Sequence, residues 1–347
     1  MKEITIKLKE GQYMADIMDA LLSDSIYFKI LPGIRATSME LAAMRNSVII
    51  EANVPVIRGK RTKGFFGIYE GIYIDDIVNY MSNDKIIYKK IMVTPESFYK
   101  VMKAAEILNL DIYKQYFLLF DECDRTMKDV AFREKILLPL NDFFKFDQKA
   151  FISATAVLPT DPRFIEHNFK KVLIDPTYDY RKEIELIPSN NVSLSLKNLI
   201  EANPNETFCI FLNSIRGITS LIEDLQIKEE SQIFCSREKM YPLRSKGYNC
   251  DEQITSSFGI LNGFTSRFNS AVDIMMDVQP IVVLATNLHF ADHTMIDPRS
   301  EAIQIVGRFR NGVKKIYAIS NFSDSLSAKN REQCLSFSTA VSKVITI

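Results

Sequence analysis

The stretch LLFDECDR, residues 118 to 125, decides how this chain is interpreted. Its apolar run stops abruptly at Asp121 and Glu122, two adjacent acids. Burying neighbouring carboxylates at the end of a core strand costs free energy unless a cation or a reaction uses them. The alternative is a pair of acids on an exposed loop, and this stretch by itself leaves both interpretations open. The acid pair is therefore a candidate functional site.

Six short runs of β-branched and aromatic residues recur along the chain, each followed by a segment of helical character. They are SVIIEA (47–52), KIMVT (90–94), YFLLFD (116–121), AFISAT (150–155), TFCIFLN (207–213) and PIVVLAT (280–286). Continuous apolar runs that alternate with helices are typical of parallel strands covered on both faces. The sequence predicts an α/β protein with mainly parallel, doubly wound sheets flanked by helices.

The length of the chain predicts two domains, because 347 residues exceed what one hydrophobic core usually organises. The stretch LIDPTYDYRKEIELIPSNN, residues 173 to 191, is rich in turn-forming residues and divides the strands into two sets. We expect an N-terminal domain over residues 1–180 and a C-terminal domain over residues 181–347.

Composition indicates a globular protein, with 47% hydrophobic and 25% charged residues. The 43 basic and 43 acidic residues balance, so nucleic-acid binding would have to rest on a local groove. The five cysteines are far apart without CxxC spacing, which argues against a zinc site and for free thiols in a reducing compartment. They are Cys123, Cys209, Cys235, Cys250 and Cys334.

Location follows from the same features. The amino terminus, MKEITIKLKEGQ, lacks the apolar centre of a signal peptide, and no apolar run approaches the roughly 18 residues that span a membrane. We expect a soluble cytoplasmic protein without a membrane partner. The abundance of Lys, Ile, Asn, Phe and Tyr suggests an AT-rich genome, and a bacterial or phage-infected cell is the suspected source.

Two further motifs support a functional interpretation of the acid pair. Ligands of open parallel sheets bind beyond the carboxyl ends of the strands, where Asp121 stands. The next strand ends in Ser153 and Thr155, within AFISATAVLP, and EAIQIVGRFRNG (301–312) follows near the carboxyl terminus. In this order, the three stretches resemble motifs II, III and VI of the superfamily 2 helicases and translocases, the DEAD/DEAH-like proteins.

The resemblance extends over nearly the whole chain. Four more stretches are similar to motifs Ia, Ib, IV and V: VIIEANVPVIRGK (48–60), IMVTPESF (91–98), TFCIFLNSIRG (207–217) and IVVLATNLHFADHTMID (281–297). Motif V departs from the family pattern, since Ala291 and Asp292 follow its threonine where a Gly and an Asp are common. The resemblance implies two tandem RecA-like domains that clamp ATP between them.

The roles of the site residues follow from this resemblance. Asp121 would hold Mg²⁺ and Glu122 would act on the attacking water. Arg308 would reach the γ-phosphate from the second domain, with Gln304 and Arg310 assisting it. Ser153 and Thr155 would couple hydrolysis to domain movement.

The phosphate-binding loop matches the family less well. It is LPGIRATSMEL, residues 31 to 41, where Ala36 occupies the position of the family's lysine and Arg35 replaces a glycine. The lost ammonium removes a charge-assisted contact worth about 1.5 to 3 kcal/mol, and Arg35 is the nearest candidate to supply charge. The residues expected to bind ATP are Gln12, Gly33, Arg35, Ala36, Thr37 and Ser38, with Thr37 and Asp121 on the magnesium ion.

The expected partner is a single strand of nucleic acid, DNA rather than RNA, held through its phosphates by loops of both domains. The candidate contacts are Thr94, Asn213, Ser214, Arg216, Arg267 and Thr286. Because the chain has little room beyond the two domains, a protein partner could supply the choice of target. The carboxyl-terminal stretch 325–347 fits either a packing helix or a docking surface.

The leading prediction is an ATP-dependent helicase or translocase that hydrolyses Mg-ATP at the interdomain cleft. The alternative is a non-hydrolysing relative that binds nucleic acid or acts as a scaffold, and Ala36 is its main support. A nucleotide-binding fold acting on small molecules is disfavoured, because such enzymes need neither the SAT stretch nor the Q-x-x-G-R pattern.

Overall fold

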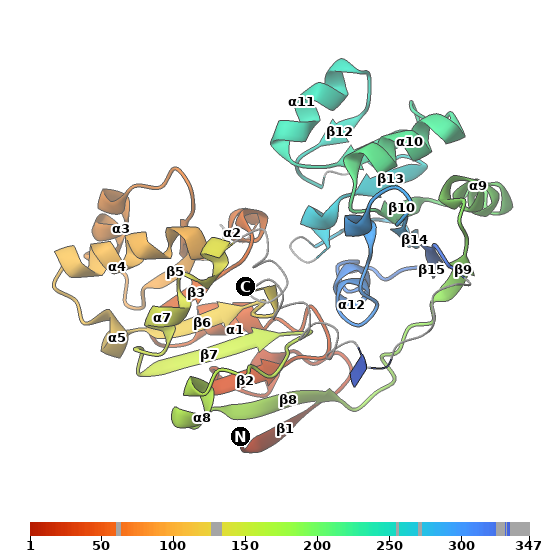
Figure 1. The fold of residues 1–347 in the computed structure, drawn as a ribbon. Coiled ribbons are helices and arrows are strands. Elements are labelled where there is room, and N and C mark those ends of the chain that lie inside the picture. The colour runs from red at the N-terminus through yellow and green to blue at the C-terminus, as the bar shows by residue number, and fades with distance from the viewer. Residues whose placement is uncertain are drawn as a thin grey trace, which may run out of the picture.

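The computed structural model describes residues 1–59, 64–125, 134–254, 257–269, 273–323, 330 and 332–333. These residues form two lobes, one from the amino-terminal half of the chain and one from the carboxyl-terminal half (Figure 1). Each lobe is built on one sheet, and every pair of neighbouring strands in both sheets is parallel. All six predicted strands are present, and the α/β prediction is confirmed.

The first sheet has eight strands in the order β1-β8-β2-β7-β6-β3-β5-β4. Their bounds are β1 (Glu3–Leu8), β2 (Ser25–Phe28), β3 (Ser47–Ile50), β4 (Phe66–Ile68), β5 (Lys90–Val93), β6 (Phe117–Asp121), β7 (Gln148–Ser153) and β8 (Lys170–Pro176). The neighbours β2, β7 and β6 lie in the middle of this sheet. Their carboxyl ends therefore lie next to one another, away from the outermost strands β1 and β4.

Helices connect these strands. They are α1 (Ala36–Ala42), α2 (Val54–Gly59), α3 (Ile74–Met81), α4 (Phe98–Ile107), α5 (Ile112–Gln115), α7 (Leu140–Phe143) and α8 (Arg163–Glu166). Short 3-10 turns are η1 (Met14–Asp16), η2 (Pro95–Ser97) and η3 (Glu134–Leu137).

Helices and loops cover both faces of the first sheet, and the side chains of β3 show this directly. Val48 and Ile50 belong to one buried cluster, whereas Ile49 between them belongs to another. Successive side chains of a strand point to opposite faces, so each cluster is the core on one side of the sheet. A strand buried on both faces requires a continuous apolar run, which is why this pattern could be recognised in the sequence.

The second sheet has seven strands in the order β12-β11-β13-β10-β14-β15-β9. Its strands are β9 (Glu185–Pro188), β10 (Phe208–Phe211), β11 (Ser231–Phe234), β12 (Cys250–Asp251), β13 (Leu261–Phe264), β14 (Ile281–Thr286) and β15 (Lys315–Ser320). Its helices are α9 (Val192–Ala202), α10 (Ile215–Leu225), α11 (Arg237–Ser245) and α12 (Glu301–Val306), with 3-10 turns η4 (Ser266–Phe268) and η5 (Asp292–Thr294). Phe208 and Ile210 face one core of this sheet and Cys209 and Phe211 the other.

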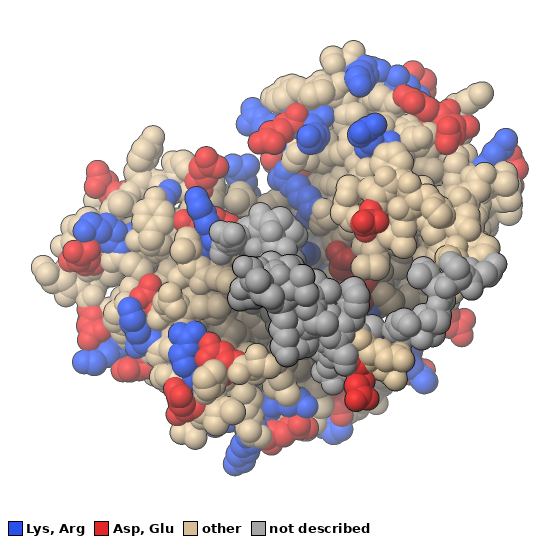
Figure 2. Space-filling model, viewed as in Figure 1, with Lys and Arg blue, Asp and Glu red and all other residues tan. Residues whose placement is uncertain are grey.

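The last strand of the first sheet ends at Pro176 and the first strand of the second begins at Glu185. The predicted domain bounds fall between them and stay a prediction. Cys123, Cys209, Cys235 and Cys250 are buried thiols, whereas Cys334 and most of the stretch 325–347 lie outside the described residues. No helix in the described ranges is long and apolar enough to cross a membrane. Acidic and basic side chains are interspersed over the visible face of both lobes (Figure 2).

Candidate functional site

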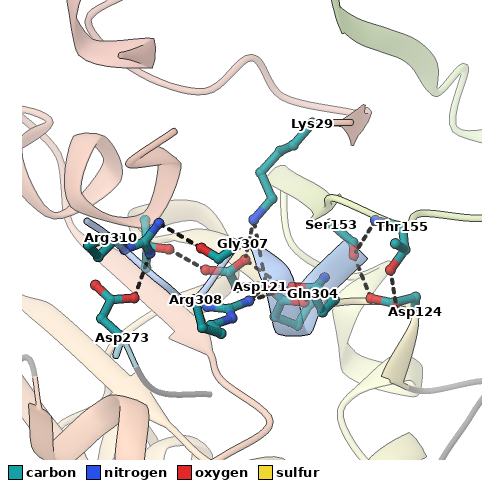
Figure 3. A network of polar contacts seen from close by, with 12 residues as sticks. Lys29, Asp121, Asp124, Ser153, Thr155, Asp273, Gln304, Gly307, Arg308 and Arg310 are labelled. Atoms are coloured by element: carbon teal, nitrogen blue, oxygen red, sulfur yellow. Dashed lines mark hydrogen bonds and ion pairs between the residues drawn. The ribbon is translucent and has the colours of Figure 1, made fainter. Parts of the chain in front are cut away.

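Three neighbouring strands bring the candidate site together at the carboxyl edge of the first sheet. Asp121 ends β6, Ser153 ends β7, and Lys29 directly follows β2. Phe28 pairs with Ser153, and Asp121 pairs with Ile152. The parallel register therefore places an ammonium group, a hydroxyl group and a carboxylate within one small region (Figure 3).

The acid pair is buried, and its backbone is unusual. Asp121 is 2% exposed and Glu122 is 9% exposed, so the acids are buried and do not lie on an exposed loop. The hydroxyl of Thr37 donates a hydrogen bond to Oδ2 of Asp121, and the backbone N–H of Glu122 donates to Oδ1 at 3.0 Å. Glu122 has a φ of 52°, in the left-handed region. Non-glycine residues held there cost conformational energy and are concentrated at functional sites.

The loop from β2 into α1 has Ala36 at the position where a phosphate-binding loop has its lysine. Ala36 is 3% exposed and packs in the hydrophobic cluster that contains Met14 and Met39. Arg35 has a φ of 61°, and its guanidinium carbon lies 3.8 Å from the ring centroid of Tyr13. The arginine expected to supply charge to the loop is thus engaged in a cation–π contact at the mouth of the site.

Sequence reasoning missed Lys29, a basic group of the first domain that the structure places beside both acids. Its ammonium nitrogen lies 3.5 Å from Oδ1 of Asp121 and 3.7 Å from Oε1 of Glu122, and the residue is only 6% exposed. Burial by itself lowers the pKa of Lys29, but the carboxylates of Asp121 and Glu122 raise it above its ordinary value. The signal that could have found it is a lysine directly after a buried β-branched and aromatic run.

The second domain reaches the acid pair through α12 and the residues after it. The amide nitrogen Nε2 of Gln304 donates a hydrogen bond of 2.9 Å to Oε2 of Glu122. The Nη2 atom of Arg308 lies 3.7 Å from Oε1 of the same glutamate and donates to the Oε1 atom of Gln304. The pattern predicted from the sequence therefore brings Gln304 and Arg308 onto Glu122 across the domain boundary.

Arg308 carries an unsatisfied donor. Its Nε atom is buried and has no hydrogen-bond partner within the described part of the chain, and the residue is 8% exposed. Burial lowers the pKa of Arg308, and Glu122 opposes this only in part. A buried guanidinium with an unused N–H is suited to an anion that has entered the site.

Two glycines allow the domains to approach each other. A Cβ atom on Gly33, whose φ is 81°, would collide with the guanidinium of Arg310. A Cβ atom on Gly307 would collide with the ring of Pro32. Arg310 is held there by Asp273, 2.5 Å from its Nη2 atom, and by the carbonyl of Gly307. Arg310 thus contacts the phosphate-loop glycine instead of the acid pair.

The SAT stretch contacts the acid run at Asp124. The hydroxyl of Ser153 donates to Oδ1 of Asp124 at 2.5 Å, and the hydroxyl of Thr155 donates to Oδ2 at 2.8 Å. Asp124 itself is 3% exposed. The two hydroxyl groups therefore bind both oxygens of one buried carboxylate, two residues beyond Glu122 (Figure 3).

A cavity of about 940 Å³ beside the acid pair is lined by residues of both domains. The first domain contributes the loop Gly33–Ser38 with Lys29, Asp121 and Glu122, and the second contributes Asp273 and Arg308–Arg310. Four basic and four acidic side chains of the described residues line it. They are Lys29, Arg35, Arg308, Arg310, Glu51, Asp121, Glu122 and Asp273. This size is in the range of small-molecule and cofactor sites.

The donor set fits a nucleotide phosphate with a divalent cation. Thr37 and Asp121 offer adjacent hard oxygen atoms, which Mg²⁺ prefers. No group of three or more His, Cys, Asp or Glu residues suited to a metal ion occurs in the ranges that the structure describes. Magnesium commonly takes one or two protein oxygens and completes its shell with phosphate and water, so this sparse set is appropriate for it.

The remaining predicted residues lie outside this contact network. Gln12 accepts a hydrogen bond from the backbone N–H of Lys9 and does not line the cavity. Thr94 is buried after β5, where its backbone N–H donates to Ile68. Ser38 does line the cavity. The structure does not test the roles predicted for these three residues, and they stay predictions.

The candidate nucleic-acid contacts of the second domain have local partners. Ser214 caps α10 by accepting from Gly217, and Arg216 beside it is exposed. Asn213 accepts from Asn269, and Arg267 forms an ion pair of 3.1 Å with Glu252. Thr286 accepts a hydrogen bond from Ile296. These side chains follow β10, β13 and β14, whose carboxyl ends are adjacent.

Comparison with known proteins supports the fold. No protein-family model and no curated protein matches the chain. Among solved structures, it is similar to S. cerevisiae Dbp5 bound to RNA and ADP BeF3, with a TM-score of 0.52 and 14% identity over 97% of this chain and 82% of that chain. A point variant of Dbp5 with the same ligands gives a TM-score of 0.53 and 14% identity over 99% and 82%. At this identity the likeness confirms the fold, two tandem RecA-like domains.

Proposed function

We propose that this chain is a superfamily 2 helicase or translocase that binds Mg-ATP between its two domains and hydrolyses it while gripping a single strand of nucleic acid. One observation carries the proposal. Glu122 of the first domain is contacted by both Gln304 and Arg308 of the second, at the wall of a cavity that the phosphate loop also lines. Phosphoryl transfer to water needs acid, amide and guanidinium groups gathered at one point.

Each group has a defined task in this proposal. Thr37 and Asp121 hold the magnesium ion, which neutralises phosphate charge when bound. Glu122 orients the attacking water and accepts its proton. Gln304 fixes the glutamate through its amide, and Arg308 neutralises the charge that develops on the transferred phosphoryl group. Ser153 and Thr155 connect the end of β7 to Asp124, so that a change at the acids is transmitted to the neighbouring strand.

The proposed track is a single strand across the loops at the carboxyl edges of both sheets. The candidate contacts are Thr94, Asn213, Ser214, Arg216, Arg267 and Thr286. The comparisons lend no support to the expected preference for DNA, because the similar structures of Dbp5 contain RNA. Since such loops hold phosphates and sugars, both nucleic acids belong in the test.

The second candidate is a clamp that binds nucleotide or nucleic acid without turnover. Ala36 favours it, because this buried methyl group stands where the family's lysine would contact phosphate. The two candidates share the fold and differ in whether phosphate is released.

The test is steady-state phosphate release from Mg-ATP, with and without single-stranded DNA or RNA of equal length. We expect one nucleic acid to stimulate release, and we expect Glu122→Gln to abolish it with ATP binding retained. Removal of a positioned general base typically costs about 10² to 10⁴ in rate. Glu206→Gln is the matched control, since Glu206 is an acid of the second domain that pairs with Lys314 and does not line the cavity. Release indistinguishable from that of Glu122→Gln, with strand binding intact, would leave the clamp as the function.

A further inference from the structure

The cleft contains a lysine that no phosphate-loop pattern predicts, and its position is fixed by the backbone. The N–H of Lys29 donates to the carbonyl of Ser153 at 2.9 Å, which extends the β2–β7 ladder by one step. Ile30 then turns the chain with a φ of 59°. A β-branched residue rarely adopts this region, so the turn is held by its surroundings. The side chain of Lys29 is thereby directed along the sheet edge toward the acid pair (Figure 3).

Among the described residues, three other basic groups line the cavity, and the two arginines that contact the loop after β2 are already engaged. Arg35 stacks on Tyr13, and Arg310 pairs with Asp273 and lies against Gly33. Arg308 belongs to the second domain and is held by Gln304. Among the first-domain residues that the structure describes, Lys29 is therefore the basic side chain that lines the cavity and contacts both acids.

We propose that Lys29 binds the β- and γ-phosphates of the nucleotide and so replaces the lysine that the loop lacks at Ala36. The ammonium group reaches the phosphates from the end of β2 instead of from the first turn of α1. This inference rests on the proposed nucleotide site and identifies which side chain of the first domain gives it affinity for a triphosphate.

The charges of the site explain why a phosphate is needed. Lys29 is paired with the same two carboxylates that are proposed to serve the magnesium ion and the water. Once a divalent cation neutralises Asp121, the buried ammonium loses much of its compensating charge. A buried cation without an anion is strongly unfavourable, so an incoming phosphate oxygen restores the balance.

The experiment measures binding, independently of turnover. Full-length protein is titrated with fluorescent ATP and fluorescent ADP in Mg²⁺, using wild type and Lys29→Met. We expect the methionine variant to lose about 10- to 100-fold in ATP affinity, the effect of one charge-assisted hydrogen bond, and to lose less for ADP. Lys29→Arg keeps the positive charge and is expected to retain most of the preference for ATP.

A matched control separates phosphate binding from a structural role. Lys149 is also a buried lysine of the central strands, 2.9 Å from Asp24, but it stands at the amino-terminal start of β7. We expect Lys149→Met to bind both nucleotides as the wild type does. Lys29→Gln, which can still donate hydrogen bonds to the acids, replaces the methionine variant if that variant does not fold.

The outcomes separate the two proposals. If the wild type binds neither nucleotide, the proposed function is overturned, and the role of Lys29 with it. If the wild type binds ATP and the Lys29 variants bind it equally well, only the role of Lys29 is overturned. The same holds if Lys29→Met and Lys149→Met lose affinity to the same extent, because the loss would then reflect the fold.

Discussion

The amide of Gln304 donates a hydrogen bond of 2.9 Å to the carboxylate of Glu122, joining α12 of the second domain to the acid pair of the first. The same glutamine accepts a hydrogen bond from Arg308 through its carbonyl oxygen. One amide side chain thus orients a carboxylate through its N–H donor and a guanidinium through its carbonyl acceptor. The contacts that join the two domains are therefore also contacts within the candidate site.

The first prediction concerns Arg308. Arg308→Ala should lower the rate of phosphate release by about 10³ to 10⁵, the usual contribution of an arginine that neutralises transition-state charge. Single-turnover measurement of phosphate release checks this. Arg244→Ala is the control, since Arg244 binds the carbonyl of Cys250 and does not line the cavity. A variant of Arg308 that keeps its rate to within a few fold would contradict the assignment.

The second prediction concerns the glycine contacts between domains. Gly307→Ala should prevent full closure, because the new methyl group would collide with Pro32. Small-angle X-ray scattering with Mg²⁺ and a non-hydrolysable ATP analogue should then show contraction of the wild type and none of the variant. Gly59 also lines the cavity but has nothing within 4 Å of its Cβ position, so Gly59→Ala should contract normally. Equal contraction of both variants would refute the role of Gly307 in closure.

The third prediction concerns Ala36→Lys. If Lys29 already supplies the charge, a second lysine should raise phosphate release by less than tenfold, or less than about 1.4 kcal/mol of barrier. Ala36 lines the cavity but is only 3% exposed, so a lysine there would have to extend into the cavity. Steady-state phosphate release compares this variant with the wild type. A gain of two orders of magnitude would show that the loop lacks the charge and that Lys29 does not replace it.

The fourth prediction concerns stability and pH, through a second buried lysine. Lys90 donates to the carbonyl of Glu40 at 2.8 Å and to the hydroxyl of Ser47 at 3.0 Å. Burial lowers its pKa from 10.5 to about 8, although Glu40 opposes the change. Between these two values the unfolded chain keeps a proton that the folded chain has released. The free energy of unfolding contributed by Lys90 therefore rises with pH across this window, by at most about 1.4 kcal/mol per pH unit.

Lys90→Met should lack this contribution. Urea unfolding of both proteins, at a pH near each of the two pKa values, gives the difference between their free energies of unfolding. The contributions of the other titrating groups cancel in this difference. We expect the free energy of unfolding of the wild type minus that of Lys90→Met to increase from the lower to the higher pH. A difference that stays constant would show that Lys90 does not titrate in this range.

The sequence predicted the fold well where strands are buried on both faces. Runs such as YFLLFD are continuous and apolar, and such runs have few other places in a protein. It missed the nine other described strands, among them β1 at the sheet edge, whose residues mostly alternate between exposed and half-buried, and β13, a buried strand whose four residues include an asparagine and a glycine. An edge strand lacks a continuous apolar run, and a strand of four residues is too short to show one clearly.

The site was predicted where its residues belong to a motif of fixed spacing. Glu122, Gln304 and Arg308 were proposed to face one cleft, and they are in contact. Lys29 was missed, because a sequence motif tests for lysine only at its fixed position, here Ala36. A lysine elsewhere in the chain can bring its ammonium group to the same cavity. The ion pair of Arg267 with Glu252 was likewise unpredictable, since it depends on how β12 and β13 are placed by the sheet.

The left-handed backbone of Glu122 gives this position a stability cost of its own. Glycine would adopt the same φ with less strain, by about 1 kcal/mol, but it would leave Lys29, Gln304 and Arg308 without the carboxylate that they contact. The strain at Glu122 is therefore offset by contacts from both domains. Under the proposed function the same carboxylate is the base for water, so one strained residue ties the stability of the cleft to its chemistry.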